Sequence, residues 1–180
     1  MRNLLALLTD EETLNLPTNC VITKAYFDTQ GTDETVFHDV EYKDNHISVC
    51  MSNSSGTLWV ELLQLTRPLQ IRETPKVDVR VKHITFTKDE IIQFVEDVND
   101  RNRIHREAPY IVPGLLILEY LWNHMLNSNT KAGMSIRFLS PMLANDYVFI
   151  ESQREGNVLV GKLDDMILFK ARLYDDHRTN

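Results

Sequence analysis

Three polar residues between positions 100 and 105 have side chains suited to acid–base chemistry. Asp100, Asn102 and His105 follow the spacing D-x-N-x-x-H. A histidine titrates near neutral pH, and a neighbouring carboxylate can share a water molecule with it. Residues five apart on one α-helix point about 140° from each other, so Asp100 and His105 can converge only if the chain turns between them. The segment DRNRIHREAP predicts such a polar loop, and a solvated surface loop without a catalytic role is the alternative.

Pro113 and Gly114 begin a second segment of interest, GLLILEYLWNHML. Proline in the first turn of a helix removes no needed hydrogen bond, and glycine lets a ligand approach the backbone closely. The free N–H groups at this helix start could bind a carbonyl oxygen that becomes negatively charged, although an ordinary Pro-Gly helix start explains the same residues. The helix is apolar on nearly every face, so we expect protein to surround it.

Glu119 is the acidic residue inside this apolar helix. A carboxylate among leucines is unfavourable unless it is protonated or paired. A protonated Glu119 could act as a catalytic acid. Alternatively, Glu119 pairs with Arg137 or another basic residue, or it faces solvent at the helix edge. The sequence leaves all three possibilities open.

The elements that position these residues follow from the pattern of apolar side chains. A capping box of Thr87 and Glu90 predicts an amphipathic helix that ends near Asn99, and a short helix is expected at 4–8. Runs of β-branched and aromatic residues predict strands at 20–27, 34–42, 46–52, 57–65 and 77–86, and again at 134–139, 146–153, 157–163 and 166–174. This order predicts an α+β fold in which an antiparallel sheet wraps around the long buried helix.

Composition restricts the class of protein further. The chain has 180 residues, of which 43% are hydrophobic and 25% charged, so one domain or two packed halves can form a substantial core. A net charge of −7 argues against nucleic-acid binding. Cys20 and Cys50 are too few for a disulfide scaffold or a thiolate zinc site, although a single bridge is left open. The short apolar run near residue 5 predicts no signal peptide, and no run predicts a membrane span, so we expect a cytoplasmic protein.

The stretch FTKDEIIQFVEDVNDRNRIH (86–105), its Gly-led helix and FLSPMLANDY (138–147) together resemble the MaoC-like dehydratases and (R)-specific enoyl-CoA hydratases, which have the hotdog fold. The resemblance covers about residues 80–174. In that family a proline and a Gly-Asp pair occupy the next hairpin, which Pro141 and Asn145-Asp146 match with asparagine in place of glycine. The resemblance implies a hotdog half over 80–180. Residues 1–79 have the length and strand number of a degenerate second half, so we expect a double hotdog.

The resemblance also implies residue roles. Asp100 and His105 would be the catalytic pair, Asn102 would support their geometry, and the amide of Gly114 would bind the thioester carbonyl. The implied enzyme is a hydro-lyase that adds water to, or removes it from, a 2-enoyl or 3-hydroxyacyl thioester. The substrate would be carried on coenzyme A or an acyl carrier protein (ACP), without a metal or redox cofactor. Hotdog units pair between chains or within one chain, so monomer and homodimer both stay open.

Two departures from that family keep other functions in view. The segment between His105 and Gly114 is shorter than usual, and Pro113 stands where a histidine is common. The stretch YIVPGLLILEYL instead resembles β-hydroxyacyl-ACP dehydratases, whose central helix starts Pro-Gly and carries a catalytic acid at the position of Glu119. The catalytic histidine of those enzymes would align near Pro109, so that pair is incomplete. A hotdog acyl thioesterase and a non-catalytic acyl-binding subunit are the alternatives.

Overall fold

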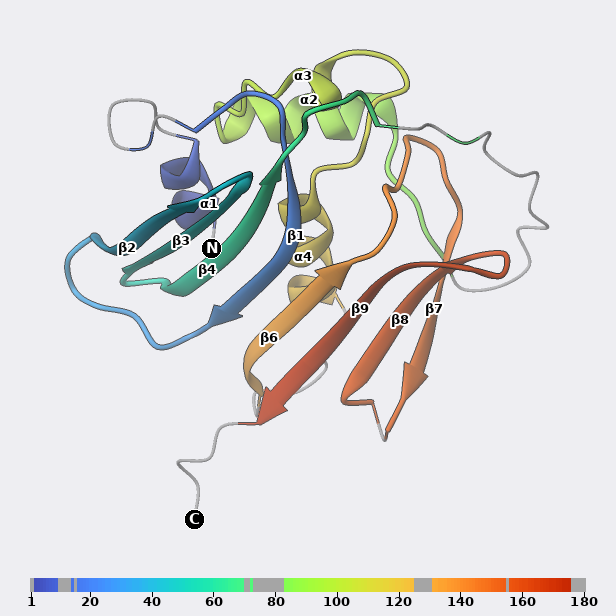
Figure 1. The fold of residues 1–180 in the computed structure, drawn as a ribbon. Coiled ribbons are helices and arrows are strands. Elements are labelled where there is room, and N and C mark those ends of the chain that lie inside the picture. Colours follow the sequence, from blue (N-terminus) through green and yellow to red (C-terminus); the bar gives the residue numbers. More distant parts are fainter. Residues whose placement is uncertain are drawn as a thin grey trace.

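Four helices and nine strands form the described part of the chain in a computed structural model (Figure 1). The residues that the structure describes are 2–9, 14, 16–69, 72, 83–124, 131–154 and 156–175. The helices are α1 (Arg2–Leu8), α2 (Lys88–Asp97), α3 (Arg103–Arg106) and α4 (Gly114–His124). The strands are β1 (Cys20–Asp28), β2 (Val36–Lys43), β3 (His46–Asn53), β4 (Gly56–Gln64), β5 (His83–Ile84), β6 (Lys131–Phe138), β7 (Val148–Gln153), β8 (Val158–Leu163) and β9 (Met166–Asp175).

All the described strands join one antiparallel sheet in the order β2-β3-β4-β1-β6-β9-β8-β7-β5. The two halves of the chain meet where β1 pairs with β6, from Lys24 opposite Arg137 to Asp28 opposite Gly133. Read outward from this seam, the first half has the order β1-β4-β3-β2 and the second has β6-β9-β8-β7-β5. The first four strands of each half therefore follow the same order, and β5 is an addition to the second half.

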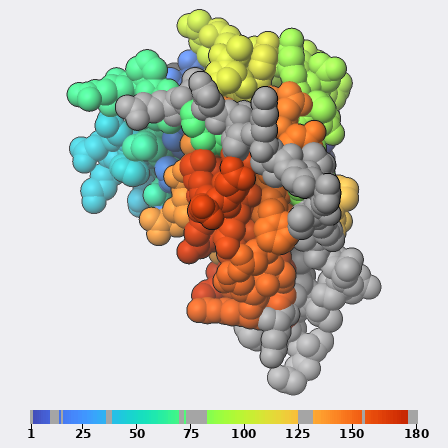
Figure 2. Space-filling model, turned by 90° about the vertical axis from the view of Figure 1, so that its right-hand side faces the viewer, coloured from blue at the N-terminus to red at the C-terminus, as the bar shows by residue number. Residues whose placement is uncertain are grey.

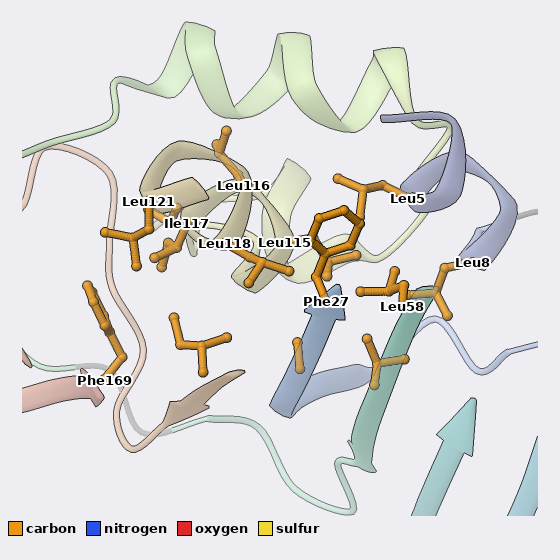
Figure 3. Packing of buried hydrophobic residues seen from close by; sticks show 14 of the residues in the cluster. Leu5, Leu8, Phe27, Leu58, Leu115, Leu116, Ile117, Leu118, Leu121 and Phe169 are labelled. Carbon is orange, nitrogen blue, oxygen red and sulfur yellow. The ribbon is translucent and has the colours of Figure 1, made fainter. Parts of the chain in front are cut away.

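The buried helix α4 lies against the seam between the two halves. Its side chains Leu115, Leu116, Ile117, Leu118 and Leu121 are all buried, and α4 contacts both β1 and β6. Burial of each such side chain contributes about 1.5–3 kcal/mol to folding. Figure 3 shows Leu5 and Leu8 of α1 packed into the same core, near Phe27 and Leu58. The core therefore runs without interruption through both halves.

Most of the elements predicted from sequence are present, with three corrections. The polar loop between the long helices contains the short helix α3. The strand expected at 146–153 begins only at Val148, because Asp146 is in a turn. Of the strand expected at 77–86, the described part contains only His83–Ile84 as a strand, and residues 85–86 are not part of it. Residues 77–82, and with them the domain boundary expected between 79 and 80, lie outside the described residues.

Both cysteines are free, so the single bridge left open by the sequence does not form. Among the described helices, none is long and apolar enough to cross a membrane. In the view of Figure 2, α2 and α3 cover the top of the molecule, above the face formed by β7, β8 and β9. The segment that carries the D-x-N-x-x-H spacing therefore lies at one end of the sheet.

Candidate functional site

The end of α2 places Asp100. The helix begins at the predicted capping box, in which the Glu90 amide donates to Thr87 Oγ1 at 3.2 Å. After its last turn Asn99 adopts a φ of 53°, a left-handed conformation that asparagine tolerates better than most residues. The Asp100 amide then donates to Val95 O at 2.7 Å, which closes the helix end. The chain reverses here, so Asp100 is held at a fixed turn rather than on a mobile loop.

Asn102 ties the motif together and fixes it to the sheet. Its backbone amide donates to Asp100 Oδ1 at 2.8 Å, and its side chain caps α3. Its Nδ2 atom donates to Cys20 O at the start of β1, at 2.5 Å. The Asn102 side chain therefore fixes the turn between Asp100 and His105, and the start of α3, to the first half of the chain.

The short helix α3 brings His105 back towards Asp100. The His105 Nε2 atom lies 3.8 Å from Asp100 Oδ2, and the two side chains are only 10% and 18% exposed. This distance is too long for a direct hydrogen bond, but both atoms can lie about 2.8 Å from one water molecule placed between them. The turn that the sequence required for convergence is therefore present, and α3 creates it.

A backbone contact defines the protonation of His105. Its Nδ1 atom lies 2.7 Å from Ile111 O, which can only accept a hydrogen bond, so Nδ1 carries the hydrogen. The lone pair of Nε2 consequently faces Asp100. Burial lowers the pKa of His105, the Asp100 carboxylate and the Ile111 carbonyl oppose this effect, and Arg106 adds to it. His105 is therefore neutral at pH 7, with its basic nitrogen directed at a carboxylate.

The start of α4 offers hydrogen-bond donors beside this pair. Leu116 and Ile117 both donate their amides to Pro113 O. The structure gives no acceptor, within the described residues, for the amides of Gly114 and Leu115. A Cβ at position 114 would lie 3.0 Å from the ring of Phe138, so any side chain larger than hydrogen would press on that ring. The glycine is thus needed for the packing of Phe138, and the amides of Gly114 and Leu115 are the donors at this helix start that could serve a ligand oxygen.

A cavity of about 280 Å³ joins these groups. Asp100, Asn102, His105 and Gly114 all line it. The remaining wall is mostly apolar and comes from both halves of the chain, with Leu8, Leu16, Leu62, Phe94, Met142 and Phe169 among its residues. Leu139, which is 46% exposed, also lines the cavity and marks a side of it that reaches solvent. Four of the five residues singled out from the sequence thus share one pocket with room for an apolar chain.

Glu119 lies outside this cavity. Its carboxylate accepts hydrogen bonds from Arg2 Nε at 3.1 Å and Arg2 Nη2 at 2.9 Å. Of the three alternatives left by the sequence, pairing with a basic residue applies, but the partner is Arg2 rather than Arg137, which is exposed on β6. Arg2 also contacts Asp97 at 2.5 Å, so it links α1 to both α2 and α4. Glu119 is thus paired with Arg2 and is not among the residues that line the cavity with Asp100 and His105.

The hairpin before β7 supports the cavity wall. Asp146 is completely buried, accepts the Leu143 amide at 2.7 Å and pairs with Arg72 at 2.5 Å. Asn145, which stands where the resembled family has glycine, adopts a φ of 63°. Met142 O in turn accepts the Val112 amide at 2.8 Å, next to the carbonyl that holds His105. The hairpin therefore fixes the backbone on which the histidine depends.

Sequence reasoning missed two contributors to the site. The carbonyl of Ile111, which orients His105, gives no sequence signal because every residue has a carbonyl group. The contribution of Leu8 and Leu16 to the apolar wall was not predicted either, because a leucine in a sequence indicates only a buried position. No group of three His, Cys, Asp or Glu side chains that could hold a metal ion occurs within the described ranges.

No family model matches the sequence, and no curated protein matches it. Several solved structures resemble the fold. HtdX from Mycobacterium tuberculosis matches 97% of this chain and 85% of its own length, with a TM-score of 0.67 and 12% identity. A MaoC-like dehydratase from Phytophthora capsici matches 92% and 72%, with a TM-score of 0.54 and 10% identity. The 12:0-ACP thioesterase from Umbellularia californica matches 94% and 82%, with a TM-score of 0.50 and 7% identity.

These likenesses, together with the antiparallel sheet around α4, define the fold class as hotdog. The matched structures include a MaoC-like dehydratase and a 12:0-ACP thioesterase. At 7–12% identity the likeness extends to the fold alone.

Proposed function

We propose that this chain is a hydro-lyase that adds water to a 2-enoyl thioester or removes it from a 3-hydroxyacyl thioester. The observation that carries the proposal is the placement of Asp100 Oδ2 and His105 Nε2, 3.8 Å apart, on the wall of a mostly apolar cavity. Two acceptor atoms at this separation can both accept hydrogens from one water molecule. The rest of the wall suits an acyl chain.

In the hydration direction, the bridging water donates one hydrogen to each acceptor, which leaves its oxygen free to attack C3 of the substrate. An O–H bond breaks, the new C3–O bond forms, and the electron pair of the double bond moves towards the thioester oxygen. The amide of Gly114 donates to that oxygen and stabilises the enolate. The proton taken by the pair then returns to C2, so one molecule of water is added and both side chains are regenerated. The dehydration direction reverses these steps.

We further propose that the fold is a double hotdog, with residues 1–79 as the degenerate half and 80–180 as the half with the site. The shared strand order of the two halves supports this division, as does the antiparallel β1–β6 pair at their seam. In the first half α1, of seven residues, precedes β1 as the eleven-residue α4 precedes β6. A fused pair of this kind would supply within one chain the interface that single hotdogs form between chains.

An acyl thioesterase is the second candidate, because the same water could attack the carbonyl carbon beside the Gly114 amide instead of C3. The two reactions give different products. Hydration removes the absorbance of the conjugated enoyl thioester and releases no thiol, whereas hydrolysis releases a thiol that a chromogenic disulfide detects. The test therefore follows both signals with short-chain and medium-chain 2-enoyl substrates, carried on coenzyme A and on an acyl carrier protein.

The expected result is loss of enoyl absorbance without thiol release, abolished by His105→Ala. Thiol release that depends on Asp100 would assign the thioesterase reaction. Neither signal with any of these substrates, from a protein that still binds an acyl thioester, would assign a non-catalytic acyl-binding subunit and refute the proposed hydro-lyase.

A further inference from the structure

The outer face of the sheet carries a second groove, of about 440 Å³, which the proposed chemistry does not use. We call it the basic groove; the basic residues that line it are Lys24, Arg137, Arg154, Lys162, Lys170 and Arg172. None of the described residues that line it is acidic, in a chain with 26 acidic and 19 basic residues. Nearly a third of the positive charge therefore lies on one face of a protein whose net charge is −7.

The strand register aligns these charges. Lys24 on β1 lies opposite Arg137 on β6, which lies opposite Lys170 on β9. Cross-strand neighbours of like charge repel each other, because their Cβ atoms are only about 5 Å apart. Lys24 is paired with Glu61 at 2.6 Å. Arg137 and Lys170 are exposed, and the structure gives neither an acidic partner among the described residues. An arrangement that opposes folding in this way is explained if a negatively charged partner binds there.

The groove and the catalytic cavity share a wall. Side chains alternate across a strand, so neighbours in sequence face opposite sides of the sheet. Phe138 and Phe169 line the cavity, and their sequence neighbours Arg137 and Lys170 line the groove. These two pairs lie on β6, which borders the seam, and on β9, its neighbour in Figure 1. Immediately after β6, Leu139 is exposed at the cavity. A partner bound in the groove would therefore lie about one sheet thickness from the site.

We infer that the basic groove docks an acidic acyl carrier protein, which delivers the thioester on its flexible prosthetic arm past Leu139 into the cavity. This inference rests on the proposed function, and it selects the carrier protein over coenzyme A as the bearer of the substrate. The basic residues extend across β1, β6, β9 and β8, a width of about 14 Å at the usual strand spacing, which suits a protein surface.

Other occupants fit the observations less well. A second copy docked face to face through a twofold axis would bring the aligned charges against their own copies. A nucleic-acid strand crossing the sheet would meet Glu61 on one side of the groove and Glu151, which pairs with Lys162, on the other. An acidic protein with a limited patch of charge avoids both conflicts and gains from electrostatic steering.

The test uses charge reversals inside and outside the groove. Arg137→Glu and Lys170→Glu each change the net charge as much as the control Lys43→Glu, an exposed residue of β2 far from the groove in the strand order. Arg137→Glu also replaces a repulsive neighbour of Lys24 and Lys170 by an attractive one, so we expect its melting temperature to equal or exceed that of the wild type. Loss of function in this variant would thus not reflect unfolding.

For each variant the ratio of kcat/KM for an enoyl-ACP to kcat/KM for the same enoyl group on coenzyme A is measured. We expect this ratio to fall about tenfold for both groove variants, and to change less than twofold for Lys43→Glu. A similar fall in the control, or no fall in the groove variants, overturns the inference. A parallel fall for both substrates, which leaves the ratio constant, overturns the choice of carrier protein over coenzyme A.

Direct binding separates this inference from the proposed reaction. Binding of the carrier protein, without an acyl group, is measured by calorimetry in low salt, with a single-stranded 20-nucleotide DNA as a second probe. Carrier binding that weakens in Arg137→Glu and at high salt supports the groove even if no thioester is turned over. Absence of carrier binding to the wild type, or tighter binding of the DNA, refutes it even if the enzyme hydrates enoyl-CoA.

Discussion

Replacement of Asp100 by asparagine isolates the negative charge of the site from its structural contacts. Asp100 Oδ1 accepts the Asn102 amide at 2.8 Å, and an asparagine oxygen can accept it equally well. The other oxygen, Oδ2, faces His105 Nε2 at 3.8 Å and becomes an NH₂ group in the variant. A donor in this place points hydrogens at the position of the bridging water, so the water loses one of its two acceptors.

The loss of activity follows from that geometry. Removal of one member of an acid–base pair lowers the rate by about 10²–10⁴-fold, which corresponds to about 3–5.5 kcal/mol in the activation free energy. The free energy of unfolding should change by less than about 1 kcal/mol, because the hydrogen bond to Asn102 persists. In the Asp100→Ala variant that hydrogen bond is lost as well, so about 1 kcal/mol of stability should disappear together with the activity.

The assay follows enoyl absorbance for wild type and both variants, and urea unfolding measures stability. Removal of the carboxylate also removes an interaction that raises the pKa of His105, so the His105 signal in NMR should titrate at lower pH in Asp100→Asn. An Asp100→Asn enzyme that retains more than about a tenth of the wild-type activity would refute the role given to the pair. Equal losses of stability in the two variants would refute the argument from the Asn102 hydrogen bond.

Three further predictions follow from the same contacts. Burial lowers the pKa of His105, so the folded state binds fewer protons than the unfolded state below about pH 6.5. The free energy of unfolding should therefore fall as the pH drops through that value, and it should fall less in His105→Gln. Urea unfolding at pH 5.5 and 7.5 will measure this difference. Gly114→Ala places a methyl group 3.0 Å from Phe138 and should cost about 1–3 kcal/mol of stability and at least tenfold in kcat/KM. Phe138→Leu in the same chain should restore part of the stability. A fully active Gly114→Ala enzyme would contradict the role given to the Gly114 amide. Arg2→Ala should lower the free energy of unfolding by about 1–2 kcal/mol, because it leaves the buried Glu119 unpaired. Glu119→Gln should keep most of the activity. Loss of activity without loss of stability in Glu119→Gln would instead support a catalytic role for Glu119.

Local patterns predicted the helices and strands well because the relevant forces act over a few residues. The capping box of Thr87 and Glu90 needs only its own turn of helix, and the alternating strands need only their neighbours. The sequence also placed Asp100, Asn102 and His105 on a segment that turns. It did not predict α3, because the capping of this four-residue helix by Asn102 is stabilised by a bond to Cys20, 82 positions earlier.

The contacts that the sequence did not predict all join segments that are distant along the chain. Glu119 was equally consistent with a catalytic acid and with an ion pair, and the choice depended on Arg2, 117 positions away. The basic groove was invisible for the same reason. Lys24, Arg137 and Lys170 are scattered along the chain, and only the register of β1, β6 and β9 places them side by side.

The sequence by itself determined which residue types were present, which segments became helix or strand, and which helix had to be buried. Hydrophobic periodicity and turn chemistry are encoded within windows of a few residues, so they can be read without a fold. Only the tertiary structure decided that His105 is neutral with Nε2 directed at Asp100, because that state depends on burial and on the carbonyl of Ile111. The same holds for the cavity, whose wall exists only after both halves of the chain have packed together.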